Sequence, residues 1–162
     1  MKLGRTLIDE TALDEGVARL ASEVDRDQAG RPVLLVGILK GSIFFLCDLA
    51  KRMRTPVTLD FLQVSSYGAG TRSSGNVRLV RDLTTDVAGR EVLIVEDIVD
   101  TGRTLQKIIE LLATRKPASV KVCALLKKKI PGNDDIAVDY LGFTIDDHFV
   151  VGYGLDCAEA YR

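Results

Sequence analysis

The sequence predicts an α/β fold, in which a mostly parallel twisted sheet is flanked by helices. Two runs, Val33–Leu39 and 92–95, are apolar without polar alternation, which suits strands of a parallel sheet that is covered on both faces. Segments with apolar residues at helical spacing alternate with such runs, an order that favours parallel strands joined by helices. The length of 162 residues predicts a single domain, 1–162, with a sizeable core.

The individual elements follow from the same patterns. An amphipathic helix is expected at 11–28, because its apolar residues recur at helical spacing and Gly30 and Pro32 end it. The segment 65–76, SSYGAGTRSSGN, is rich in glycine and serine and predicts a mobile loop that forms an antiparallel flap. The other expected strands lie at Val33–Leu39, 57–64, 77–83, 92–95, 120–126, Tyr140–Ile145 and 149–151, and the other helices at 43–53 and after Leu105.

Composition limits the classes of function. The net charge of −1 gives no overall basic field, so no nucleic-acid partner is expected. The N-terminus does not resemble a signal peptide and the longest apolar run is too short to cross a bilayer, so no membrane association is expected. The three cysteines, Cys47, Cys123 and Cys157, lack CxxC spacing and predict free thiols in a reducing cytosol. The expected location is therefore cytoplasmic.

Three carboxylates, Glu96, Asp97 and Asp100, follow the expected strand 92–95, and a turn of small residues, 101–104, leads from them into a helix. Ligands of open α/β sheets bind beyond the carboxyl ends of strands, where the start of a helix presents free N–H groups to an anion. Carboxylates repel phosphate, so these side chains must serve ribose hydroxyls, Mg²⁺ or a transferable proton. The chain contains neither GxxxxGK[ST] nor a strand followed by GxGxxG, which argues against a P-loop and a dinucleotide site.

The segment VLIVEDIVDTGRT resembles the phosphoribosyl diphosphate (PRPP) motif of the type I phosphoribosyltransferases. Four further segments, VGILKGSIFF, DFLQVSSYG, ALLKKK and DHFVVGYGLDCAEAYR, narrow the resemblance to the hypoxanthine-guanine phosphoribosyltransferase family, over about 33–162. The resemblance implies the type I fold with a small hood, Mg²⁺ as cofactor, and a homo-oligomer, either a dimer or a tetramer. It also implies purine salvage, in which the 5-phosphoribosyl group moves from PRPP to N9 of hypoxanthine, and of guanine, to give IMP or GMP and pyrophosphate.

The resemblance also implies a role for each motif residue. Asp100 would be the general base that takes the proton from purine N7. The residues expected at the 5′-phosphate and ribose are Glu96, Asp97, Asp100, Thr101, Gly102, Arg103 and Thr104. Those expected at pyrophosphate are Lys40, Gly41 and Arg162, and those at the purine are Lys128, Phe149, Val150 and Asp156. Ser66 and Tyr67 would begin the flap, and the metal would be held by Glu96, Asp97 and Asp156.

Several points stay open at the level of sequence. Asp100 could also serve as a helix N-cap, and Phe149 could simply pack in the core. The Leu39–Lys40 or the Lys40–Gly41 peptide could be cis, as occurs in the family. Lys128, as a cation, favours a 6-oxo acceptor over the amino group of adenine. The rival functions are a related enzyme that prefers xanthine or another 6-oxo base, and a regulator that senses PRPP or nucleotides and binds nucleic acid.

Overall fold

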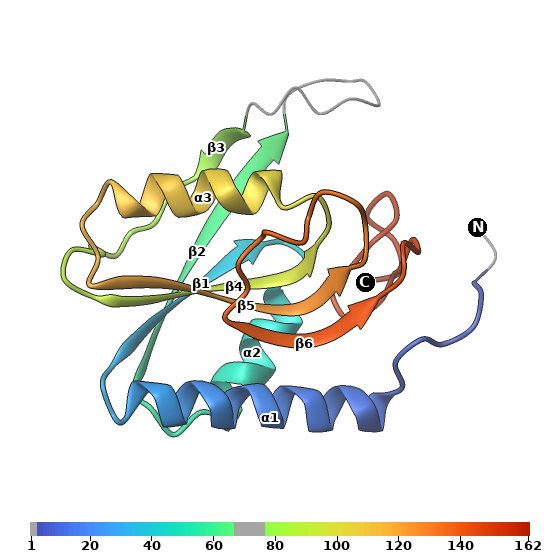
Figure 1. The fold of residues 1–162 in the computed structure, drawn as a ribbon, viewed down its shortest axis with the longest axis horizontal. Helices are drawn as coiled ribbons and strands as arrows, with labels where there is room; N and C mark the ends of the chain where they lie inside the picture. The colour runs from blue at the N-terminus through green and yellow to red at the C-terminus, as the bar shows by residue number, and fades with distance from the viewer. Residues whose placement is uncertain (1–2, 67–76) are drawn as a thin grey trace.

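The computed structural model describes residues 3–66 and 77–162, which form a six-stranded sheet between two layers of helices (Figure 1). Helices α1 and α2 cover one face of the sheet and α3 covers the other. The strands are β1 (Val33–Leu39), β2 (Val57–Ser66), β3 (Val77–Arg81), β4 (Glu91–Val99), β5 (Ser119–Lys128) and β6 (Tyr140–Ile145). The helices are α1 (Glu10–Gln28), α2 (Ile43–Arg52) and α3 (Arg103–Ala113).

The strand order is β3-β2-β1-β4-β5-β6, and every neighbouring pair is parallel except β2 and β3. The prediction of a mostly parallel, helix-flanked sheet is therefore confirmed. Because β1, β4 and β5 run in the same direction, their carboxyl ends meet at one edge of the sheet. None of the helices within 3–66 and 77–162 has the length and apolarity needed to span a membrane.

Alternation along β1 divides the core into two parts. Val33 and Leu35 belong to the cluster beneath α1 and α2, whereas Leu34 and Val36 belong to the cluster beneath α3. All four side chains are buried, because successive residues of a strand point to opposite faces and both faces are covered. Each buried Leu or Val contributes roughly 1.5–3 kcal/mol. This explains why a central strand reads as an unbroken apolar run.

The first helix starts and packs for identifiable reasons. Asp9 is its N-cap, and the Asp9 carboxylate accepts a hydrogen bond of 2.8 Å from the N–H of Ala12. At Gly16 a Cβ atom would lie 2.5 Å from the ring of Phe143, so the absence of a side chain lets α1 approach β6.

Two differences from the sequence prediction bear on the site. The predicted strand 149–151 is wrong: the chain loops after β6 and makes only isolated bridges, Gly152 with Leu155 and Cys157 with Ala160. Residues 149–151 form no strand, and positive φ angles at Gly152 and Gly154, 98° and 104°, turn the backbone directly after them. In β4, Glu96 and Asp97 lie within the strand and not after it, because pairing with β5 continues as far as Val99. The flap tip, including Tyr67, lies outside the described residues.

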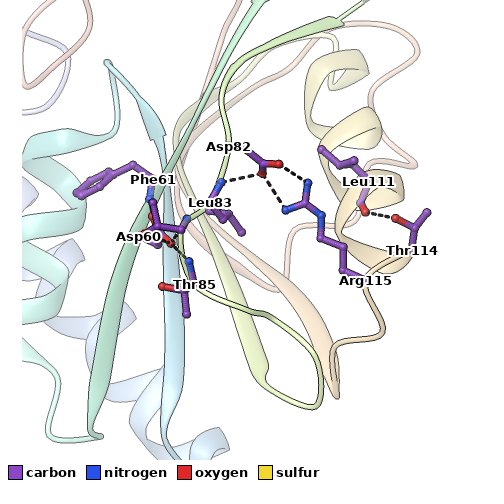
Figure 2. Close-up of polar contacts among 9 residues, drawn as sticks. Asp60, Phe61, Asp82, Leu83, Thr85, Leu111, Thr114 and Arg115 are labelled. Atoms are coloured by element: carbon purple, nitrogen blue, oxygen red, sulfur yellow. Dashed lines mark hydrogen bonds and ion pairs between the residues drawn. The ribbon is translucent and has the colours of Figure 1, made fainter.

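Two aspartates fasten the connection between β3 and β4 (Figure 2). The buried carboxylate of Asp60 in β2 accepts hydrogen bonds from the N–H groups of Phe61, Thr84 and Thr85, at 2.8, 2.9 and 2.7 Å. Asp82 accepts two hydrogen bonds of 2.8 Å from the guanidinium of Arg115, just beyond α3. This ion pair connects the segment after β3 to the segment after α3.

Candidate active site

A cavity of about 250 Å³ opens at the carboxyl ends of β1, β4 and β5, and it is lined largely by residues that the sequence singled out. Five elements supply them, namely the turn after β1, the end of β4 with the following turn, the end of β5, the loop after β6, and the C-terminal segment. The nine predicted residues in the lining are Lys40, Gly41, Asp97, Asp100, Lys128, Phe149, Val150, Asp156 and Arg162.

Close approach of backbone fixes the floor of this cavity. The peptide bond between Leu39 and Lys40 is cis. A Cβ atom at Gly41 would lie 1.7 Å from a carboxylate oxygen of Asp97, and one at Gly154 would lie 2.0 Å from the carbonyl oxygen of Gly41. Any side chain at either glycine would therefore push these segments apart. Gly41 and Gly154 let the turn after β1, the end of β4 and the C-terminal loop meet.

The ammonium group of Lys128 lies between two carboxylates. Its Nζ is 3.2 Å from Asp100 Oδ2 and 3.0 Å from Asp147 Oδ1, and its side chain is only 13% exposed. Burial by itself lowers the pKa of Lys128, but the hydrogen bonds to Asp147 and Asp100 outweigh it and raise the pKa. Lys128, which lines the cavity, is thus held as a cation.

Asn133, which no sequence motif marked, connects the backbones of Asp100 and Lys128. Its side-chain amide donates to the carbonyl oxygens of Asp100 at 2.7 Å and Lys128 at 2.8 Å, and the residue is 1% exposed. A buried amide that satisfies two loop carbonyls fixes the spacing of both backbones.

Glu96, which is buried, and Asp97, which is half-buried, form an acidic pair. Burial, and then the charge of Asp97, raise the pKa of Glu96 well above its ordinary value. Burial also raises the pKa of Asp97, although the N–H of Ile98 donates to its carboxylate at 2.8 Å. Of the two, only Asp97 lines the cavity, because adjacent strand residues point to opposite faces.

The start of α3 continues the site beyond Asp100. Gly102 is the N-cap residue, with φ of 74°, and no side chain caps the helix. The alternative role of Asp100 as the N-cap is therefore wrong. Thr101, Arg103 and Thr104 are exposed around this helix start, and the start of a helix favours an anion.

The loop after β6 supplies Phe149 and Val150 to the lining of the cavity. Phe149 is 68% exposed, so the alternative that it packs in the core is wrong. Arg162 reaches back across the loop, donating to the carbonyl of Gly154 at 2.6 Å and lying 3.1 Å from Asp156. Ser66 ends β2. A larger cavity, of about 560 Å³, lies behind Phe149 against the N-terminal segment, but its lining is mainly apolar and offers little for charged chemistry.

The carboxylates fit a magnesium ion that is shared with a substrate. The described part of the chain has no cluster of three or more Asp, Glu, His or Cys side chains that could hold a metal alone, and Glu96, Asp97 and Asp156 are not gathered into one. Mg²⁺ usually keeps several waters and binds through one or two carboxylates plus substrate phosphates. Asp97 and Asp156, which both line the cavity, provide that kind of oxygen ligand.

Carboxylates and cations line one cavity beside the start of α3, an arrangement that suits a phosphorylated ligand. Comparison with known proteins agrees. The phosphoribosyl transferase domain family matches residues 6–158. The hypoxanthine-guanine phosphoribosyltransferase of Bacillus subtilis is 44% identical over 158 residues, which cover 98% of this chain and 88% of that protein. The chain therefore belongs to the phosphoribosyltransferase family, in its hypoxanthine-guanine branch.

Two further relatives place the chain within that branch. A crystal structure of a hypoxanthine-guanine phosphoribosyltransferase from Bacillus anthracis, with a HEPES molecule in its active site, superposes with a TM-score of 0.94 at 41% identity, covering 99% of this chain and 95% of that one. The bifunctional protein TilS/HprT of Listeria monocytogenes is 48% identical over 98% of this chain. The chain spans 24% of the length of that bifunctional protein.

Proposed function

We propose that this chain is a purine salvage enzyme that transfers the 5-phosphoribosyl group from PRPP to N9 of hypoxanthine and of guanine. The products are IMP or GMP and pyrophosphate. We further propose that it works in the cytoplasm as a homo-oligomer, a dimer or a tetramer, with Mg²⁺ and without a nucleic-acid or membrane partner. The observation that carries the proposal is the contact of 3.2 Å between Lys128 and Asp100 at one cavity.

The pair assigns a role to each partner. As N9 of the purine forms a bond to C1′ of the ribose, the bond from C1′ to the pyrophosphate oxygen breaks, and the proton on N7 must leave. Asp100 accepts that proton. Lys128 donates a hydrogen bond to the 6-oxo group of the same base, and Phe149, exposed beside them, offers a ring face for stacking. Val150 presents backbone groups to the base edge.

The other end of the substrate lies at the start of α3. The turn from Asp100 to Thr104 offers backbone N–H groups and two threonine hydroxyls to the 5′-phosphate. Asp97, with Glu96 behind it, accepts hydrogen bonds from the ribose hydroxyls. Lys40, Gly41 and Arg162 receive the pyrophosphate. Asp97 and Asp156 would hold Mg²⁺, which would neutralise the charge that develops on the leaving pyrophosphate.

Pyrophosphate release tests this function. The purified protein with PRPP, hypoxanthine and Mg²⁺ should release pyrophosphate and form IMP in equal amounts. EDTA should abolish turnover, and added Mg²⁺ should restore it. Because the described residues contain no metal cage, chelation should leave the melting temperature of the substrate-free protein unchanged. Binding of PRPP without any release of pyrophosphate would instead favour the regulator.

A further inference from the structure

Glu159 holds the two cations that the proposed function assigns to pyrophosphate. One of its carboxylate oxygens, Oε2, lies 3.0 Å from Nζ of Lys40 and 3.3 Å from Nη2 of Arg162. The Glu159 side chain is 67% exposed, so this contact lies at the mouth of the cavity and not in the core. No motif in the sequence marks Glu159 for a role.

The loop around Glu159 keeps its shape without this side chain. The backbone N–H of Glu159 donates to Asp156 Oδ2 at 2.7 Å, and Cys157 and Ala160 exchange hydrogen bonds of 2.9 and 3.0 Å. Arg162 retains Asp156 and the carbonyl of Gly154 as partners. The Glu159 carboxylate can therefore swing away while the loop and Arg162 stay in place.

Lys40 depends on Glu159 much more than Arg162 does. Within residues 3–66 and 77–162, Glu159 is the one ionic partner of the Lys40 side chain. An anionic oxygen that bridges an ammonium and a guanidinium makes the same kind of contact as a phosphate oxygen. A diphosphate and the Glu159 carboxylate therefore compete for the N–H donors of Lys40 and Arg162.

We propose that Glu159 is an internal competitor of the diphosphate group, occupying Lys40 and Arg162 in the free enzyme and giving them up when PRPP or pyrophosphate binds. This inference rests on the proposed function, because it assumes that the two cations form the pyrophosphate subsite. The competition weakens the binding of pyrophosphate and so speeds its release. Since exposed ion pairs are weak, its removal should tighten pyrophosphate binding by roughly two- to tenfold.

Calorimetric titration of three variants with magnesium pyrophosphate tests the competition. Glu159→Gln removes the charge at nearly constant shape and should lower the Kd for pyrophosphate roughly two- to tenfold. Glu159→Asp keeps the charge but shortens the reach, and should give an intermediate Kd. Asp146→Asn is the matched control, because it changes net charge equally but removes a carboxylate that lies near Lys129. Its Kd should equal that of the unmutated protein.

Each other outcome decides against the inference. If Glu159→Gln binds pyrophosphate as the unmutated protein does, or more weakly, then Glu159 orients the two cations and does not compete. If Asp146→Asn tightens binding equally, general charge repulsion is the cause. The unmutated protein could release pyrophosphate from PRPP and hypoxanthine while Glu159→Gln does not tighten pyrophosphate binding. In that case the proposed function stands and only the competition by Glu159 is rejected. If the unmutated protein binds no pyrophosphate, the subsite is rejected and both fall together.

Discussion

Two buried carboxylates of the sheet lie in opposite surroundings. Asp60 in β2 is 3% exposed, and Glu96 in β4 is 8% exposed. Burial alone would raise the pKa of Asp60, but hydrogen bonds from Phe61, Thr85 and Thr84 outweigh it and hold the pKa below its ordinary value (Figure 2). At Glu96, burial and the charge of Asp97 act in the same direction and raise the pKa.

We interpret the difference as that between a carboxylate that stabilises the fold and one whose proposed role is to bind a ligand. Asp60 has donors from the protein itself and binds the β3–β4 connection to β2. Glu96 lies next to another acid, so its ionised form is stabilised only when hydroxyls or a cation arrive. Groups with raised pKa values gather at functional sites for this reason. The following substitutions test whether the two roles are as distinct as the surroundings indicate.

The largest expected effect is on catalysis and leaves stability alone. Asp100→Asn should keep PRPP binding but lower kcat by roughly 10²–10⁴, the usual range for loss of a general base. The side chain of Asp100 is 55% exposed, so the urea unfolding curve should barely move. Single-turnover rates should be compared if product release limits kcat. A variant whose chemical step runs at the unmutated rate would remove Asp100 from the mechanism.

A smaller effect, on stability and not on chemistry, is expected at Asp60. Asp60→Asn replaces one acceptor oxygen by an amide that meets the N–H groups of Thr84 and Thr85, and should lower the free energy of unfolding by about 3 kcal/mol. The folded-state pKa of Asp60 is lowered below the ordinary Asp value, near 4. The contribution of ionised Asp60 to the free energy of unfolding is therefore present in full above that ordinary value. It is lost as the pH falls through the folded-state pKa.

Urea unfolding at several pH values measures both parts of this expectation. The gap between Asp60→Asn and the unmutated protein should be widest near pH 7 and should narrow below about pH 4. Equal stability at pH 7 would show that the hydrogen bonds at Asp60 contribute nothing net.

The opposite sign is expected at Glu96. The folded-state pKa of Glu96 is raised above the ordinary Glu value, near 4.3. The free energy of unfolding therefore falls as the pH rises from that ordinary value to the folded-state pKa, and it stays lower above it. Glu96→Gln supplies a neutral side chain of the same shape, so the substrate-free, metal-free protein should gain about 1 kcal/mol at pH 7. Thermal unfolding in EDTA measures this gain. If Glu96→Gln instead lowered the free energy of unfolding as much as Asp60→Asn does, the proposed difference between the two carboxylates would be contradicted.

The sequence predicted the features that depend on neighbouring residues. The helix-flanked parallel sheet follows from apolar runs such as Val33–Leu39, and the position of Asp97 and Asp100 near the carboxyl end of β4 follows from the acidic residues after the expected strand 92–95. The resemblance to a known family supplied the roles. The loop at 149–151 escaped prediction because a short apolar run fits a strand and an exposed site loop equally well.

Contacts between residues far apart in the chain could not be predicted from the sequence. Asn133 binds the carbonyl of a residue 33 positions away, and Glu159 binds Lys40 across 119 positions. Neither residue has a local pattern that marks it. An asparagine after Pro-Gly is ordinary turn chemistry, and a glutamate near the C-terminus is an ordinary surface charge. Only the fold shows that each meets a functional residue.

The choice of base tests the central claim most directly, because it depends on Lys128 as the donor facing position 6 of the purine. The measurement is kcat/KM for hypoxanthine, guanine, xanthine and adenine under identical conditions. A lysine donor opposed to the amino group of adenine leaves both groups unpaired, at a cost of about 1–3 kcal/mol or more. Hypoxanthine and guanine should therefore be used best, then xanthine, and adenine least, and Lys128→Ala should narrow the lead over adenine. Equal use of adenine and hypoxanthine by the unmutated protein would contradict both the role of Lys128 and the proposed reaction.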